Sequence, residues 1–291
     1  MILNGLGVAM ITPFNRSGKI DYEKIPLIVD NIVSGSADYI VVLGTTAETF
    51  LLSKVEKNAL IKFIIEVNDN RLPMVIGIGG NNTDLVIKDI KNTDLNNFSA
   101  ILSVSPYYVK PSQEGILKHY IKLSKESPVP LIVYNVPNRT GSMIEKDTFI
   151  RLINYTDNII AIKEASGNFS FSQDLINSVP KNVKIICGDD HYSLPMILSG
   201  ASGSISVIGN AFPKKISRMI SFANSGDLKK AYKIHFELLD LIKYLFLEGN
   251  PTGIKELMSQ LSFCSNHVRL PLVSASKELS NKIAQKLSEI N

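Results

Sequence analysis

Cysteine is scarce in this sequence of 291 residues. The two cysteines, Cys187 and Cys264, lie far apart and form no CxxC pair. A disulfide framework or a zinc ribbon is therefore not expected, and the composition is typical of a reducing cytoplasm. The apolar N-terminus has no basic start and is interrupted by glycines and a proline, so it predicts a strand rather than a signal peptide.

Long apolar runs and concentrated charge are also missing. No apolar run approaches the roughly 18 residues that a membrane-spanning helix needs. The net charge is +4, from 31 basic and 27 acidic residues, and the lysines are scattered rather than gathered in a basic stripe. Nucleic-acid binders more often carry such a stripe with aromatic residues between the charges. We therefore expect a cytoplasmic protein with no membrane segment and no nucleic-acid partner.

Eight short apolar runs, separated by helix-like segments, recur at intervals of roughly 20–35 residues, the size of a strand–helix unit. Several are continuous rather than alternating, as in parallel strands covered on both faces. Between two of them, Ser53 and Glu56 form a capping box that predicts a helix start. The pattern predicts a (β/α)8 TIM barrel. The runs are residues 5–11, 39–43, 74–78, 100–105, 130–134, 159–163, 183–187 and 203–207.

The alternative fold is an open doubly wound sheet. It is disfavoured because residues 77–84, GIGGNNTD, lack the third glycine of the dinucleotide-binding GxGxxG loop. From residue 227 the pattern changes to one long amphipathic helix, which EGNP at 248–251 ends, and at least two further helices follow. No Gly/Ser-rich linker intervenes. We therefore expect a catalytic barrel over residues 1–226 and a helical subdomain, packed on the barrel, over residues 227–291.

In such a barrel, reactive groups lie where the strands end. The predicted strand ends carry hydroxyls, phenols, an amine and an arginine, but no metal-ligand cluster. Of the four histidines only His191 follows a strand closely, so a three-histidine zinc site is not expected. Asp189 and Asp190, just before His191, are interpreted as helix caps.

Lys163 ends the apolar run of residues 159–162. One interpretation is that its stem packs in the barrel while its ammonium reaches solvent or pairs with Glu164. The other is catalytic, because burial disfavours the charged form of an amine and a neutral amine attacks ketones to form a Schiff base. That chemistry needs a proton shuttle. Tyr134 ends the neighbouring strand, and Thr45 with a second phenol can link it to solvent.

Two further strand ends can bind carboxylates. Thr45 and Thr46 follow Gly44, and their hydroxyls and nearby backbone N–H groups suit an anion, although a plain capping turn has the same sequence. Arg139 offers a planar guanidinium to a second carboxylate, although it also fits an ordinary surface arginine. One amine and two carboxylate sites indicate a keto acid and a second acidic substrate.

These motifs together resemble the dihydrodipicolinate synthase family, also called 4-hydroxy-tetrahydrodipicolinate synthase. The likeness runs from the first strand through residues 268–272 and covers nearly the whole chain. Related aldolases such as N-acetylneuraminate lyase share the barrel, the tyrosine and the lysine, whereas Arg139 and the context of Lys163 are more specific to the synthase. The matching segments are GTTAET (44–49), SPYYVKPSQEG (105–115), YNVPNRTG (134–141), IIAIKEASGN (159–168), GDD (188–190) and GSISV (203–207).

The resemblance implies a lyase that condenses pyruvate with L-aspartate 4-semialdehyde, the committed step of diaminopimelate and lysine biosynthesis. It implies no metal or organic cofactor and a homotetramer built as a dimer of dimers. Lys163 matches the imine-forming lysine and Tyr134 the proton donor and acceptor. The other matching positions are Thr45 and, from a neighbouring subunit, Tyr108 in the proton relay; Thr46, Ile205 and Gly188 in substrate binding; and Arg139 at the semialdehyde carboxylate.

The sequence departs from the family in two places. Ala47 replaces a glycine common after the two threonines. A methyl group restricts a backbone that glycine leaves free, but we expect the turn to tolerate it. Lysine-inhibited relatives look to have a carboxylate at the position of Leu85. They often have histidines at the positions of Lys54 and Lys57. Asn81 and Tyr107 match the rest of that allosteric site. We therefore predict weak or absent inhibition by lysine.

Two other functions stay open from the sequence. One is a different Schiff-base pyruvate aldolase, such as N-acetylneuraminate lyase or a keto-deoxy sugar acid aldolase, against which Arg139 argues. The other is a non-catalytic barrel that senses a small acid, which predicts no imine at Lys163.

Overall fold

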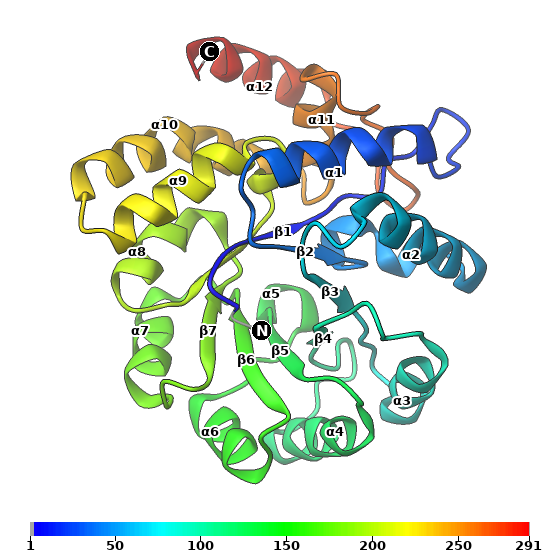
Figure 1. The fold of residues 1–291 in the computed structure, drawn as a ribbon, viewed down its shortest axis with the longest axis vertical. Coiled ribbons are helices and arrows are strands. Elements are labelled where there is room, and N and C mark those ends of the chain that lie inside the picture. The colour runs from blue at the N-terminus through cyan, green and yellow to red at the C-terminus, as the bar shows by residue number, and fades with distance from the viewer. Residues whose placement is uncertain (1–2, 291) are drawn as a thin grey trace. The chain divides into compact units, whose positions relative to one another are not determined.

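The computed structural model describes residues 3–290 and contains a closed barrel of eight parallel strands in the order β1 to β8 (Figure 1). This confirms the TIM barrel and rules out the open sheet. Every predicted run forms a strand, with ends that differ by a residue or two. The strands are β1 Gly5–Ala9, β2 Tyr39–Val42, β3 Met74–Gly77, β4 Ala100–Val104, β5 Leu131–Asn135, β6 Ile159–Glu164, β7 Lys184–Cys187 and β8 Gly203–Ser206.

The chain divides into two compact units. One contains residues 3–4 and 73–205, and the other contains residues 5–72 and 206–290. This division has no boundary at residue 227. The expected boundary there, between the barrel and the helical subdomain, therefore stays a prediction.

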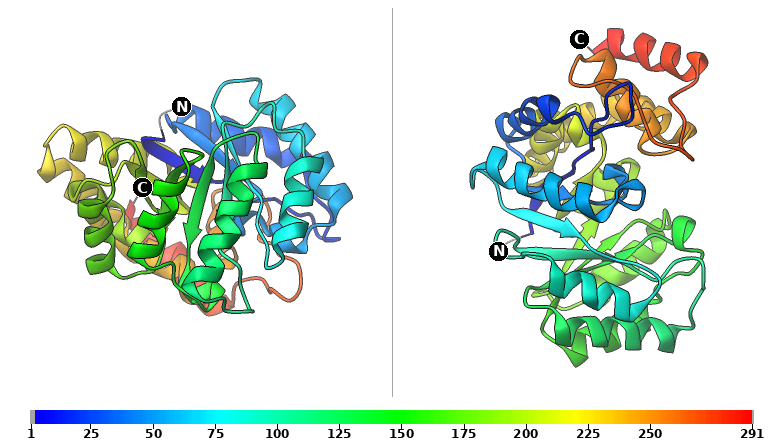
Figure 2. Two further views of the ribbon diagram at one scale, coloured as in Figure 1. Left: turned by 90° about the horizontal axis from the view of Figure 1, so that it is seen from below. Right: turned by 90° about the vertical axis from the view of Figure 1, so that its right-hand side faces the viewer.

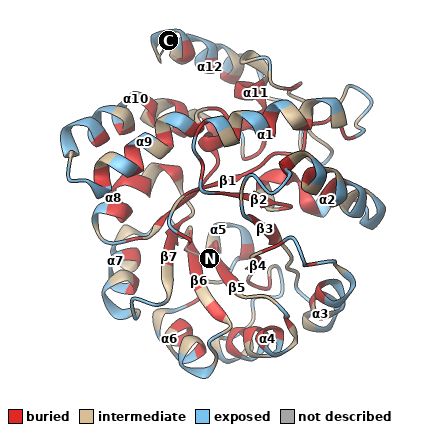
Figure 3. Cartoon of the chain, in the orientation of Figure 1, coloured by how far each residue is buried: buried red, intermediate tan, exposed pale blue. Residues whose placement is uncertain are grey.

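In the first unit, strands β3 to β8 are nearly completely buried, as Figure 3 shows for β5 to β7. Their residues are mostly Ile, Val, Leu and Ala, which suits parallel strands that are covered on both faces. The parallel register sets Tyr134 of β5 opposite Lys163 of β6. The helices of this unit are α3 Thr83–Asn92, α4 Gln113–Glu126, α5 Pro137–Thr140, α6 Lys146–Tyr155, α7 Phe169–Ser178 and α8 Ser193–Leu198.

The second unit holds β1, β2 and the helical tail. The predicted capping box is present, since Ser53 Oγ accepts from Glu56 N at 3.2 Å and Glu56 Oε2 accepts from Ser53 N at 2.9 Å. Figures 1 and 2 show α11 and α12, in orange and red, beside α10. The helices are α1 Ile25–Ser34, α2 Lys54–Asn68, α9 Pro213–Asn224, α10 Leu228–Leu247, α11 Thr252–Gln260 and α12 Lys277–Ile290.

The long helix predicted from residue 227 is α10, and its apolar stripe packs inward. Ala231, Leu238 and Leu241 are completely buried. The helical spacing puts Leu228 on the same face, but it is 45% exposed because it is the first residue of the helix, where few neighbours cover it. Among residues 3–290, no helix combines the length and apolar character needed to cross a membrane.

Candidate active site

Lys163 and Tyr134 lie side by side at the ends of β6 and β5. Their Cα atoms are in register, and the Lys163 Nζ lies 4.4 Å from the centroid of the Tyr134 ring. Both residues are buried, at 6% and 7% exposure. The amine therefore does not reach open solvent, and the surface interpretation of Lys163 is wrong.

Glu164 makes its hydrogen bonds elsewhere. Its Oε2 accepts from Asn135 Nδ2 at 2.6 Å and its Oε1 accepts from Ser166 N at 2.7 Å. Successive side chains of a strand point to opposite faces, so Glu164 and Lys163 diverge. Burial raises the pKa of the Glu164 carboxyl, although its two hydrogen bonds oppose that shift. The carboxylate holds the ends of β5 and β6 rather than pairing with the amine.

Gly188, after β7, leaves room for the stem of Lys163. A Cβ at Gly188 would lie 2.7 Å from Lys163 Cε and 2.9 Å from Ala165 Cβ, closer than carbon atoms approach one another. The backbone N of Gly188 donates to the carbonyl of Glu164 at 2.7 Å. The absence of a side chain at this position therefore sets the path of the lysine across β6 and β7.

Arg139 and Tyr108 lie in two connected loops of the same unit. Arg139 is an exposed residue of the short helix α5, which Gly141 caps with φ 74°. Tyr108 has φ 71°, its side chain is 88% exposed, and its N donates to the carbonyl of Thr140 at 3.3 Å. The backbone bond ties the two loops together, and the exposed phenol is accessible from outside the chain.

The first unit also contains a predicted substrate-binding residue, Ile205, and a predicted helix cap, Asp189. Ile205 is completely buried in β8. Asp189 accepts from His191 N at 3.0 Å and caps the 3₁₀ helix of residues 190–192, so its predicted role is confirmed. Asp190 is the first residue inside that helix, so its predicted role as a cap is wrong.

The threonine turn belongs to the second unit. Thr45, Thr46 and Ala47 form one turn of 3₁₀ helix, separated from the end of β2 by two residues, with Thr46 buried and Thr45 half-buried. The left-handed backbone position is not Ala47 but Glu48, whose φ is 55°. The methyl group that replaces the family's glycine therefore stands in right-handed helical backbone, where it causes no strain.

Sequence reasoning missed a buried network behind this turn. Glu48 and Lys255 form an ion pair with Nζ 2.5 Å from Oε1, and neither side chain is exposed. Asn250 Nδ2 donates to Thr46 Oγ1 at 3.0 Å. The partners are 204 and 207 residues apart in sequence, so no local pattern could have paired them.

The residues predicted to form the allosteric site fall in both units. In the first, Asn81 is exposed, Leu85 is 58% exposed at the start of α3, and Tyr107 is half-buried, which raises the pKa of its phenol. In the second, Lys54 is exposed and Lys57 half-buried, both on α2. Weak or absent inhibition of the enzyme by lysine stays a prediction.

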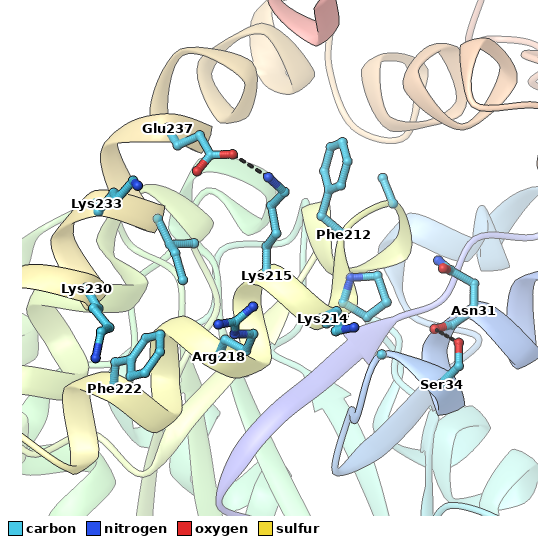
Figure 4. Close-up of a pocket in the computed structure, with 14 residues that line it drawn as sticks. Asn31, Ser34, Phe212, Lys214, Lys215, Arg218, Phe222, Lys230, Lys233 and Glu237 are labelled. Carbon is cyan, nitrogen blue, oxygen red and sulfur yellow. Dashed lines mark hydrogen bonds and ion pairs between the residues drawn. The ribbon is translucent and has the colours of Figure 1, made fainter. Parts of the chain in front are cut away.

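A hollow of about 810 Å³ lies among α1, α9 and α10 of the second unit (Figure 4). It contains none of the residues predicted for the active site. Lys215 pairs with Glu237 across it. Elsewhere, no group of three or more His, Cys, Asp or Glu side chains within the described chain is arranged to hold a metal ion.

Comparison with known proteins gives consistent matches over the whole chain. The model of the Dihydrodipicolinate synthetase family matches residues 2–290. The 4-hydroxy-tetrahydrodipicolinate synthase of Flavobacterium psychrophilum is 46% identical, with 96% of this chain and 95% of the relative covered. The 4-hydroxy-tetrahydrodipicolinate synthase of Karelsulcia muelleri is 45% identical, with 97% of this chain and 95% of the relative covered. The structure of chloride-inhibited dihydrodipicolinate synthase from Acinetobacter baumannii, complexed with pyruvate, superposes with a TM-score of 0.95 at 33% identity and covers 100% of this chain and 99% of its own.

Proposed function

The chain belongs to the dihydrodipicolinate synthetase family and is a lyase of its Schiff-base-forming type, and we propose that it condenses pyruvate with L-aspartate 4-semialdehyde. This is the reaction of a 4-hydroxy-tetrahydrodipicolinate synthase in diaminopimelate and lysine biosynthesis. The observation that carries the proposal is the buried pair of Lys163 and Tyr134, with the amine 4.4 Å from the centre of the phenol ring.

In the proposed first half-reaction, the neutral Nζ of Lys163 attacks the keto carbon of pyruvate. The carbinolamine that forms loses water to give an imine, and Tyr134 moves the protons that both steps require. Thr45 and the Tyr108 of a neighbouring subunit extend this proton relay. Thr46, Gly188 and the backbone of Ile205 bind pyruvate. Pyruvate as the first substrate is supported by the related synthase that was solved in complex with it.

In the second half-reaction, the imine loses a methyl proton to become an enamine, whose carbon attacks the aldehyde of the semialdehyde. The amino group of the semialdehyde then attacks the imine carbon and displaces Lys163, so that the product closes into a ring and the lysine is regenerated. Arg139 holds the carboxylate of the semialdehyde, for which its planar guanidinium is suited. Its exposed position in a short loop helix leaves it accessible to a substrate.

We further propose that the enzyme acts in the cytoplasm as a homotetramer, a dimer of dimers, without a metal or organic cofactor. The exposed phenol of Tyr108 supports an assembly, because a side chain that is 88% exposed in one chain is free to enter a neighbour.

Substrate comparison tests the function. The purified enzyme is given pyruvate with L-aspartate 4-semialdehyde and, in parallel, N-acetylneuraminate and keto-deoxy sugar acids. We expect turnover of the semialdehyde pair and at most traces with the sugar acids. Faster cleavage of a sugar acid would favour the alternative aldolase. An Arg139→Lys variant should raise KM for the semialdehyde much more than KM for pyruvate, because an ammonium cannot form the bidentate contact.

A further inference from the structure

The segment that follows α10 contacts the threonine turn through a buried amide. Asn250 is 8% exposed, Thr46 is 3% exposed, and Asn250 Nδ2 donates to Thr46 Oγ1 at 3.0 Å. A threonine hydroxyl carries one proton and accepts through its oxygen lone pairs. Since the amide N–H occupies an acceptor position, the hydroxyl proton of Thr46 is left to donate to another group.

Five residues further along, the same segment holds the backbone of that turn. Lys255 Nζ pairs with Glu48 Oε1 at 2.5 Å and also donates to the carbonyl of His267 at 2.9 Å. The second oxygen of Glu48 accepts from Arg269 N at 2.9 Å. Glu48 is the left-handed residue that ends the 3₁₀ turn, and a left-handed backbone is unfavourable for a residue with a side chain. The ion pair therefore fixes a turn that would otherwise relax.

We propose that Asn250 and Lys255 are positioning residues for keto-acid recognition. Asn250 orients the Thr46 hydroxyl so that it donates to the carboxylate of the keto acid, and Lys255, through Glu48, holds the backbone that carries Thr46. Asn250 does not touch the substrate and acts only through Thr46. The inference rests on the proposed function, in which Thr46 binds pyruvate.

The test compares Asn250→Ala with Thr252→Val in the full-length enzyme. Thr252 is buried to a similar degree, and its hydroxyl donates to the carbonyl of Val273 at 3.1 Å. Both substitutions remove one buried hydrogen bond from the same segment, but only Asn250 contacts Thr46. We expect Asn250→Ala to raise KM for pyruvate about tenfold and to change kcat little. A tenfold change corresponds to the free energy that one hydrogen bond contributes to binding. Thr252→Val should leave KM for pyruvate unchanged.

A double-mutant cycle shows whether Asn250 acts through Thr46. In a Thr46→Val background the hydroxyl is gone, so adding Asn250→Ala should raise KM for pyruvate no further. Additive effects of the two substitutions, or equal increases in KM for Asn250→Ala and Thr252→Val, would overturn the proposal. A wild-type enzyme that fails to turn over pyruvate would instead contradict the proposed function, so the two failures are distinguishable.

Discussion

Replacing Lys255 by methionine leaves a buried carboxylate without its counter-charge. Lys255 and Glu48 are both completely buried, and Nζ also lies 3.9 Å from the centroid of the Phe14 ring. Burial lowers the pKa of Lys255, and the Glu48 carboxylate opposes that shift. Methionine approximates the length and apolar surface of the lysine stem, so the substitution removes the charge and the hydrogen bonds while leaving no large cavity.

The magnitude follows from the burial of the pair. Removing one partner of a buried ion pair costs about 3–5 kcal/mol of stability, chiefly because the remaining charge stays desolvated. Glu48 keeps the hydrogen bond from Arg269 N in the variant, so we expect a value at the lower end, about 3 kcal/mol. The double variant Glu48→Gln/Lys255→Met contains no buried charge at this position. Its free energy of unfolding should lie within about 1–2 kcal/mol of the wild-type value.

The free energy of unfolding is measured by urea denaturation of the wild type, the single variant and the double variant. A matched control is Lys282→Met, since Lys282 pairs with Glu278 on the surface of α12 and a pair of this kind contributes little. We expect the double variant to be more stable than Lys255→Met. A double variant that is as unstable as the single one would show that desolvation of Glu48 is not the cause.

Three further predictions follow from single residues. Gly188→Ala should lower kcat by about tenfold to a hundredfold while the protein stays folded, because the new Cβ displaces the Lys163 side chain; steady-state kinetics with circular dichroism check this, and unchanged kcat would contradict it. Burial lowers the pKa of His119 from 6.5 to about 4, so the unfolded chain binds its proton at a higher pH than the native state does. Stability should therefore fall, by at most about 3 kcal/mol, as the pH falls from 6.5 towards 4, and a His119→Asn variant should lose that part of the pH dependence in urea titrations. Millimolar lysine should inhibit the wild type weakly or not at all because Leu85 offers no anion to its ammonium, and strong suppression of activity would refute this.

The barrel strands were predictable because each is a continuous apolar run bounded by polar or turn-forming residues. A strand that is covered on both faces needs this composition, and few other short elements do. The ends are less well defined: β1 ends at Ala9, although the apolar run continues to residue 11. Leu228 shows the same limit in a helix, since periodicity gives the face but not where the covering neighbours stop.

The pairing of Lys163 with Tyr134 was predictable because consecutive parallel strands bring their ends together. The ion pair of Glu48 and Lys255 was not, because its partners come from elements 207 residues apart and neither sits in a motif that names the other. The backbone of the threonine turn was also outside the reach of the sequence. From the sequence we expect the turn to tolerate Ala47, but no local pattern indicates that the left-handed residue is Glu48.

The central claim is that Lys163 forms an imine with pyruvate, and borohydride trapping tests it most directly. The enzyme is incubated with pyruvate, reduced, digested and analysed by mass spectrometry, with Lys184→Ala on the neighbouring strand β7 as the control variant. We predict one reduced pyruvate adduct, on the peptide that contains Lys163, in the wild type and in Lys184→Ala, and no adduct in Lys163→Ala. An unlabelled Lys163, or full activity in Lys163→Ala, would contradict the account.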